Sequence, residues 1–260
     1  MRKILNFCKR NLKELLRDPL LYVFCLGFPV VMFLLFYIIN KFSGGHTPTF
    51  EVRALLPGII VFSYSFIMLT LALIVSKDRQ TFFLKRLYSS PMKAHHFILG
   101  YILVGLLIGL IQTVVCILTA WIISLASNSG FISVGAIFLL IASQLPILIT
   151  NVLLGVLFGT ALNDKTAPGI CSILISLSGV LGGCWMPVET MGSLETFCRF
   201  LPFYPSVHIG RVITDATNAL GNAYTFNSIA CLGLIPIGAF MLGSVILTIV
   251  AFTKNMVSDN

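Results

Sequence analysis

Charge is the scarcest property of this sequence. Only 10% of the residues are charged, whereas 57% are apolar, and soluble globular domains carry about 25% charged residues. This shortage excludes an ordinary soluble fold and predicts an integral membrane protein. The net charge of +8 is placed at the ends of the apolar stretches rather than along one face, so we expect no nucleic-acid partner.

Motifs for nucleotide binding and catalysis are also missing. No glycine is followed by lysine anywhere in the chain, so the P-loop pattern G-x-x-x-x-G-K-[ST] is absent. The long apolar stretches contain no Asp, Glu, Lys or Arg near their middle, which disfavours an ion-coupled carrier and a membrane enzyme. The four histidines form no metal-ligand pattern. We therefore expect no catalytic residue, metal or cofactor in this chain.

Cysteine occurs seven times without any C-x-x-C spacing. Most of these residues fall inside apolar stretches, where a thiol packs as a small apolar group. Cys184 and Cys198 flank a segment expected on the external side. They could form a disulfide, but their spacing alone does not establish one.

Six stretches approach the roughly 20 apolar residues that cross a bilayer. They cover residues 20–39, 54–75, 97–125, 133–162, 168–185 and 229–252. Gly27-Phe28-Pro29 interrupts the first, and Pro57-Gly58 opens the second. The sequence thus predicts an all-α membrane protein with six transmembrane helices, forming a single transmembrane domain over residues 1–260.

The distribution of Lys and Arg predicts the orientation of these spans, because basic residues collect on the cytoplasmic side. With the N-terminus inside, the inner segments hold 13 of the 17 Lys and Arg residues and the outer segments hold 4. The inner segments are residues 1–19, 76–96, 163–167 and 253–260. We therefore expect a multi-pass protein of the cell (cytoplasmic) membrane with both termini in the cytoplasm.

Residues 1–19 precede the first span and combine basic residues with apolar residues at helical spacing. Such a pattern is typical of an amphipathic helix that lies in the membrane interface, with lipid headgroups as its partner. The helix could steer the first span as an elbow, or it could be a plain anchor on the inner leaflet.

Residues 76–93 contain a basic island between the second and third spans. The island holds 5 of the 17 Lys and Arg residues but only 1 of the 9 acids. Its adjacent aromatic residues Phe82 and Phe83 need a surface to cover them. This favours a cytoplasmic helix that docks on a soluble partner, the alternative being an ordinary basic loop.

Residues 186–228, between the fifth and sixth spans, are too polar to span and too aromatic for a free loop. Residues 193–201 have the pattern of a short amphipathic helix. Pro187, Pro202 and Pro205 break any longer helix. We expect an external helical hairpin that dips into the outer leaflet and is covered by neighbouring helices.

Small and polar residues inside the spans permit two interpretations each. The G-x-x-x-G pairs Gly105/Gly109 and Gly155/Gly159 could form a dimer seam or pack helices within one chain. Gln112, Gln144 and Asn151 could line a path for cargo or serve packing.

The order of these features resembles the membrane (permease) subunits of type-2 ATP-binding cassette (ABC) exporters, over nearly the whole chain. Four strings carry the resemblance: Leu15-Leu16-Arg17-Asp18-Pro19, Leu56-Pro57-Gly58-Ile59, residues 78–91, and Trp185-Met186-Pro187-Val188-Glu189 followed by Leu201-Pro202 and Pro205. The third string looks like the coupling helix of that family, and the fourth like its external hairpin. The Arg17-Asp18-Pro19 start looks more like the drug-, antibiotic- and peptide-exporting branch than the polysaccharide-exporting one.

The resemblance implies a division of labour among subunits. Two permease subunits, identical or different, would enclose a central pathway, and separate ATPase subunits would bind ATP and Mg²⁺ and push the coupling helix. The residues implied in that contact are Thr81, Phe82, Phe83, Leu84, Lys85, Arg86 and Leu87. Lys85 stands where the family often has an acid, which implies an ATPase groove of different charge.

Three functions follow as hypotheses. The first is export of an amphipathic cargo such as an antibiotic, a toxin peptide or a lipid, which the apolar and aromatic spans favour. The second is export of a lipid-linked polysaccharide by the same kind of machine. The third, from another class, is a membrane protein that gives immunity by sequestering a toxin without transport.

Overall fold

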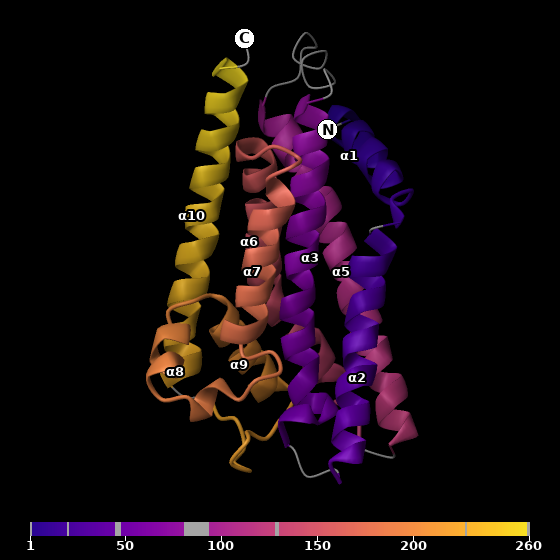
Figure 1. Ribbon diagram of the computed structural model, residues 1–260, viewed down its shortest axis with the longest axis vertical. Coiled ribbons are helices and arrows are strands. Elements are labelled where there is room, and N and C mark those ends of the chain that lie inside the picture. The colour runs from indigo at the N-terminus through magenta and orange to yellow at the C-terminus, as the bar shows by residue number, and fades with distance from the viewer. Residues whose placement is uncertain are drawn as a thin grey trace.

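The chain forms an elongated bundle of helices that run along one common direction (Figure 1). The computed structural model describes residues 2–19, 21–44, 48–80, 94–127, 130–226 and 228–258. All regular elements among these residues are helices. The longer ones are α1 Arg2–Leu15, α2 Phe28–Phe42, α3 Val52–Gln80, α5 Ala94–Ala126, α6 Val134–Ala161, α7 Ala167–Leu181, α9 Phe203–Ile213 and α10 Ser228–Ser258.

The two ends of the bundle differ in what they hold. Helix α1, the last residues of α3 and the C-terminal part of α10 lie at one end, together with both termini (Figure 1). We call this the terminal end. Helix α9 and the short helix α8 (Ser193–Cys198) lie at the opposite end, which we call the hairpin end. This arrangement agrees with the predicted grouping of both termini on one side and the hairpin on the other.

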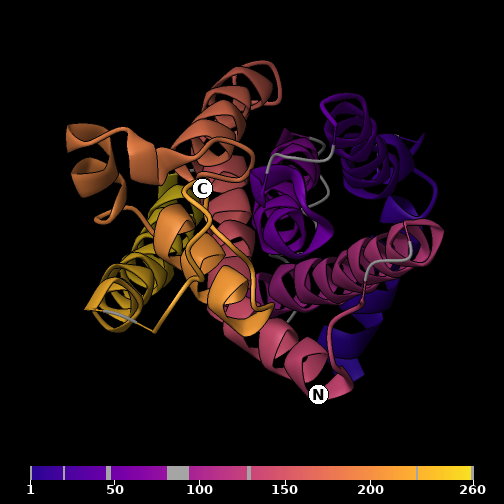
Figure 2. The same ribbon diagram turned by 90° about the horizontal axis from the view of Figure 1, so that it is seen from below.

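Helix α3 forms the centre of the bundle. Within its most apolar window, 89% of the residues are buried, against 17% in α10. Helices α2, α5, α6, α7 and α9 all pack against it, and Figure 2 shows α3 enclosed by its neighbours in the view along the bundle. Its apolar residues occur on every side, which is the pattern of a helix buried all round.

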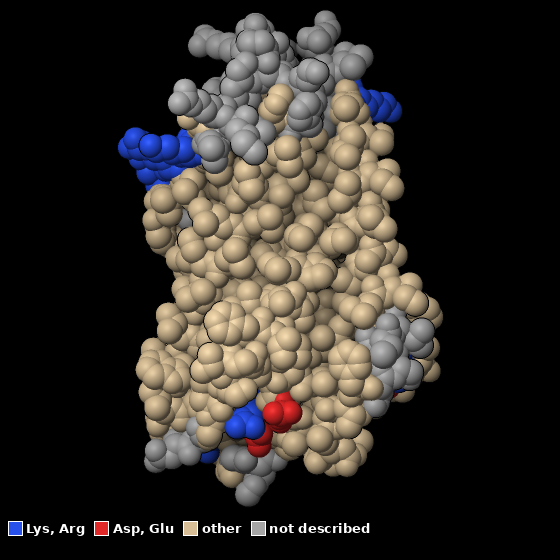
Figure 3. Space-filling view, turned by 180° about the vertical axis from the view of Figure 1, so that it is seen from behind, with Lys and Arg blue, Asp and Glu red and all other residues tan. Residues whose placement is uncertain are grey.

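The outer helices expose broad apolar surfaces instead. Large apolar side chains on α2, α5, α6 and α10 are exposed, among them Leu34, Leu118, Phe138 and Leu247. The face in Figure 3 has a wide band without charged residues between charged patches near the two ends. Such a surface is stable against lipid rather than water, which confirms a membrane protein.

Among the described residues, five helical segments are long and apolar enough to cross a membrane: Tyr22–Phe42, Val52–Gln80, His96–Ala126, Val134–Ala161 and Gly233–Ala251. They correspond to the predicted first, second, third, fourth and sixth spans, with ends shifted by a few residues. The largest shift is in the second span, because residues 76–80 continue α3 instead of starting a separate segment.

The predicted fifth span is shorter than its apolar run suggested. Helix α7 has 15 residues, or about 22 Å at 1.5 Å per residue, against a hydrocarbon core of about 30 Å. The helix ends at Gly182-Gly183, where Gly183 has a φ of +64° that side chains other than glycine rarely adopt. The count of six spans therefore stays a prediction, with five segments that meet the length.

The first span is continuous through the predicted interruption at Gly27-Phe28-Pro29. Residues Leu21–Gly27 form a π-helical stretch that leads directly into α2. Pro29 lies in the first turn of α2, where a missing N–H removes no hydrogen bond within that helix. The wider π turn precedes the proline, so the chain changes its helical winding there without breaking.

The described part of the hairpin segment contains two α-helices, α8 and α9, and a proline lies in the first turn of α9 rather than breaking it. Helix α8 lies within the predicted amphipathic helix 193–201. Helix α9 has Pro205 in its first turn, where proline is well tolerated. Helix α9 packs against α3, α6 and α10, so it is covered by neighbouring helices as expected. Cys184 and Cys198 are both buried and are not bonded to each other.

All four glycines of the G-x-x-x-G pairs pack within the chain. A Cβ atom on Gly155 would lie 2.7 Å from the Met68 carbonyl oxygen, and one on Gly159 would lie 2.5 Å from the Val75 Cβ. The Gly105 and Gly109 positions likewise face side chains of α3 and α6. These glycines bring α6 and α5 close to their neighbours in the same chain, so the packing interpretation accounts for them.

Alanine at Gly159 is expected to destabilise the fold by about 1–3 kcal/mol, because the added methyl group would overlap α3. The measurement is thermal unfolding in detergent. Gly238 in α10 provides the matched control, since nothing lies within 4 Å of a Cβ built there. Gly238→Ala should be neutral or slightly stabilising. Equal Tm values for Gly159→Ala and wild type would contradict the close α3–α6 packing.

Candidate functional site

The helix ends that flank the region predicted to contact an ATPase lie at the terminal end. Its implied contact residues, Thr81, Phe82, Phe83, Leu84, Lys85, Arg86 and Leu87, lie outside the described residues, and their role stays a prediction. The described structure shows the two helix ends that flank residues 81–93, which are the end of α3 and the start of α5.

Asp78 lies close to the end of α3 and is almost fully buried, with 3% of its surface exposed. The guanidinium of Arg10 in α1 donates two hydrogen bonds to its carboxylate, at 3.0 Å and 3.2 Å. The Tyr101 hydroxyl in α5 donates a third, at 2.6 Å. Arg10 also pairs with Glu14 on its own helix at 2.9 Å. Burying a carboxylate is costly unless it is paired and hydrogen-bonded, and here the partners come from two other helices.

The apolar face of α1 also packs on the protein. The Phe7 ring makes edge-to-face contacts with Phe97 and Tyr101 of α5, with centroids 5.3 Å and 5.1 Å apart. Gly100 lets the helices approach, since a Cβ there would lie 2.4 Å from the Phe7 ring. Leu15 is fully buried as well. The predicted interfacial helix is thus seated against α5, with Lys9, Lys13 and Arg17 on the surface of a shallow groove.

The next two residues of α3 face the opposite way. Arg79 donates to the Thr160 carbonyl at the end of α6 and, at 3.1 Å, to the Asn163 side chain. Gln80 donates to the Asp164 carboxylate at 2.8 Å. These three contacts fasten the end of α3 to the end of α6 and to the turn between α6 and α7. Residues 78–80 therefore connect α3 to elements on two sides of the bundle.

The polar residues predicted for a cargo path are all buried between helices. The side-chain amide of Gln112 donates to the Ser63 carbonyl at 3.1 Å, that of Gln144 to the Ser206 carbonyl at 3.0 Å, and that of Asn151 to the Ile147 carbonyl at 2.9 Å. The side-chain oxygen of each lacks a hydrogen-bond partner among the described residues. Gln112 and Gln144 thus join helix pairs, whereas Asn151 bonds within α6.

Sequence reasoning missed Arg211 of α9, whose guanidinium donates hydrogen bonds to several segments of the hairpin end. It is 1% exposed. It donates to the carbonyl of Ala54 at 3.1 Å, to the carbonyl of Gly183 at 2.7 Å, and to the Glu189 carboxylate at 3.4 Å. Tyr224 receives a further bond from Arg211 at 3.2 Å and donates its own to Glu189. Arg211 therefore ties together the start of α3, the turn after α7 and the segment that leads to α10.

His208 lies one turn before Arg211, between the rings of Tyr204 and Tyr224, with centroids 6.2 Å and 5.2 Å away. Burial lowers the pKa of His208, and the nearby Arg211 adds to this, while Glu189 opposes it. A neutral imidazole at pH 7 follows. The hairpin end thus has one buried positive charge in this cluster, with the Glu189 carboxylate as its partner.

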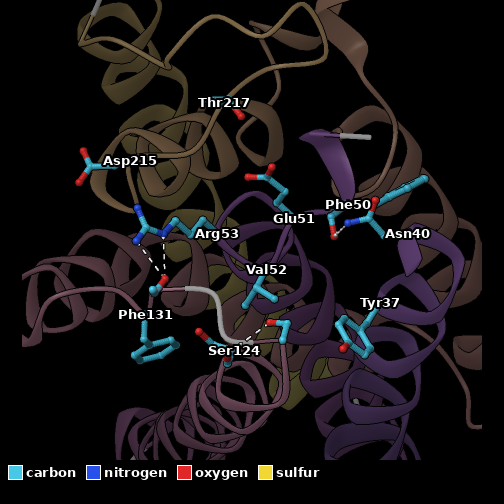
Figure 4. Close-up of a pocket in the computed structure, with 12 residues that line it drawn as sticks. Tyr37, Asn40, Phe50, Glu51, Val52, Arg53, Ser124, Phe131, Asp215 and Thr217 are labelled. Carbon is cyan, nitrogen blue, oxygen red and sulfur yellow. Dashed lines mark hydrogen bonds between the residues drawn. The ribbon is translucent and has the colours of Figure 1, made fainter. Parts of the chain in front are cut away.

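A cavity of about 460 Å³ opens at the hairpin end beside the start of α3 (Figure 4). Aromatic side chains line it together with charges of both signs. Its lining includes Tyr37, Phe50, Phe131, Glu51, Arg53 and Asp215. Arg53 donates to the Gly130 carbonyl at 2.9 Å. A mixture of aromatic faces and a few polar groups suits a small amphipathic molecule.

Comparison with known proteins agrees with the architecture. Comparison with curated protein sequences gave no match. Residues 2–214 match the family described as ABC-2 type transporter, which covers α1 to α9 and all but one of the five long apolar segments. The chain therefore belongs to the ABC-2 type transporter family, as a membrane (permease) subunit of the type-2 ABC class.

Proposed function

We propose that this chain is the permease subunit of an ATP-driven exporter in the cell membrane, powered by a separate ATPase subunit. Two permease chains, identical or different, would enclose the pathway, and the ATPase would bind ATP and Mg²⁺. The terminal end would face the cytoplasm and the hairpin end the exterior, as the Lys and Arg distribution favours. The family match over residues 2–214 carries this proposal, and the absence of a P-loop pattern from these 260 residues is consistent with ATP binding by a partner subunit.

An amphipathic cargo is the class that this chain supports best. The membrane-spanning helices are strongly apolar, with no Asp, Glu, Lys or Arg near their middle. The cavity at the hairpin end combines Tyr37, Phe50 and Phe131 with a few charged side chains. These features suit an antibiotic, a toxin peptide or a lipid better than a long sugar chain.

A strain without the gene tests the cargo class. We expect greater sensitivity to amphipathic antibiotics and antimicrobial peptides, restored by a plasmid copy of the wild-type gene. Unchanged sensitivity with altered surface glycans would contradict this cargo and favour a lipid-linked polysaccharide. Full protection in a strain whose partner ATPase has lost its P-loop lysine would contradict powered export and favour sequestration of a toxin.

A further inference from the structure

The two helix ends that flank residues 81–93 are both held by α1. Arg10 holds Asp78 near the end of α3 through a bidentate ion pair. Phe7 packs on Phe97 and Tyr101 in the first two turns of α5. The Tyr101 hydroxyl then joins α5 to the same Asp78 carboxylate at 2.6 Å. Three helices thus meet at one buried acid.

A buried acid at this position is energetically costly, so its presence points to a role beyond stability. Taking a carboxylate out of water is unfavourable, and an apolar residue would pack there at no such cost. Asp78 is the acid of the basic island, and it lies three residues before Thr81. The planar guanidinium of Arg10 binds it at two points, which sets the orientation of α1 relative to α3 as well as its distance.

We propose that Asp78 is a positioning residue. It makes α1 move as one body with the ends of α3 and α5 when the ATPase pushes on the terminal end of the bundle. Arg79 and Gln80 fasten the same end of α3 to the turn between α6 and α7. A displacement of this helix end is therefore passed to α1 and α5 through Asp78, and to α6 and α7 through its two neighbours. This inference rests on the proposed function, because it needs an ATPase that acts at the terminal end.

Hydrogen–deuterium exchange of the permease–ATPase complex tests the proposal. The complex is purified in lipid nanodiscs and compared without nucleotide and with ATP plus vanadate. In wild type, the exchange of α1 should change with nucleotide. In Asp78→Asn, which keeps an acceptor for Tyr101 but loses the ion pair, this nucleotide-dependent change should be largely lost, because the ion pair that joins α1 to α3 is gone. The change within the ATPase itself should persist.

Glu14→Gln is the matched control, because Glu14 pairs with the same Arg10 group at 2.9 Å but does not reach α3. This variant should respond as wild type does. Tyr101→Phe removes a single hydrogen bond to Asp78 and should reduce the response partly. If Asp78→Asn does not assemble, Arg10→Gln and Tyr101→Phe make the same comparison.

A wild-type response of α1 in Asp78→Asn, or in both replacement variants, would overturn the positioning role. A wild-type complex that shows no response to nucleotide in any helix would overturn the proposed function instead. The two failures are distinguishable, because the first requires a responsive wild-type complex and the second excludes one.

Discussion

Leucine at Arg211 is expected to destabilise the protein by about 3–5 kcal/mol, the usual cost of breaking a buried ion pair by removing one partner. The change leaves the Glu189 carboxylate without its cation. It also removes the donors for the carbonyls of Ala54 and Gly183, which are buried with Arg211. Thermal unfolding in detergent should show a fall in Tm on the order of 10 °C.

Arg199→Leu is the control for that change. Arg199 also pairs with a glutamate, Glu195, at 2.8 Å, but its side chain is 45% exposed. An exposed pair one turn apart contributes less than about 1 kcal/mol. Arg211→Lys should recover only part of the loss, because an ammonium group does not reproduce the fork that reaches several carbonyls. Equal effects of Arg211→Leu and Arg199→Leu would contradict the central place of Arg211 in the hairpin end.

Aspartate at both Phe82 and Phe83 is expected to abolish powered export while the protein still inserts into the membrane. Burial of two phenylalanine side chains on a partner contributes about 3–6 kcal/mol, so their loss should weaken binding of the ATPase at least about a hundredfold. The measurement is the amount of ATPase recovered per tagged permease, together with export in cells.

Phe200 and Phe226 supply the control for this pair. Both are exposed, at 71% and 61%, and both belong to the hairpin segment at the opposite end. Replacing them by aspartate should leave ATPase recovery unchanged. Normal export by the Phe82→Asp, Phe83→Asp variant would show that these residues do not dock on the ATPase.

The long helices were predictable because apolar length is a local property of the sequence. Helices α5 and α6 begin and end within a few residues of the predicted spans 97–125 and 133–162. The length of α7 was overestimated, because the apolar run continues to Trp185 whereas the backbone turns at Gly182-Gly183. The positive φ of Gly183 ends the helix there, although the apolar sequence continues for a few more residues.

The buried polar contacts were not predictable, because their partners are distant in sequence. Arg10 lies 68 residues from Asp78, and Arg211 lies 157 residues from Ala54. By charge alone, Arg211 looked like one more basic residue of an outer segment, and Asp78 like a minor exception in a basic island. Only the packing of α9 on α3, and of α1 on α5, shows that both side chains are buried.

The central claim is that this chain transports with energy supplied by another polypeptide. Its most direct test is purification of the tagged protein from its own membranes in gentle detergent, with mass spectrometry of the associated proteins and an ATP hydrolysis assay of the eluate. We predict a stoichiometric subunit that contains a P-loop and hydrolyses ATP. A stable complex without any ATPase would contradict powered transport and favour a protein that sequesters its ligand.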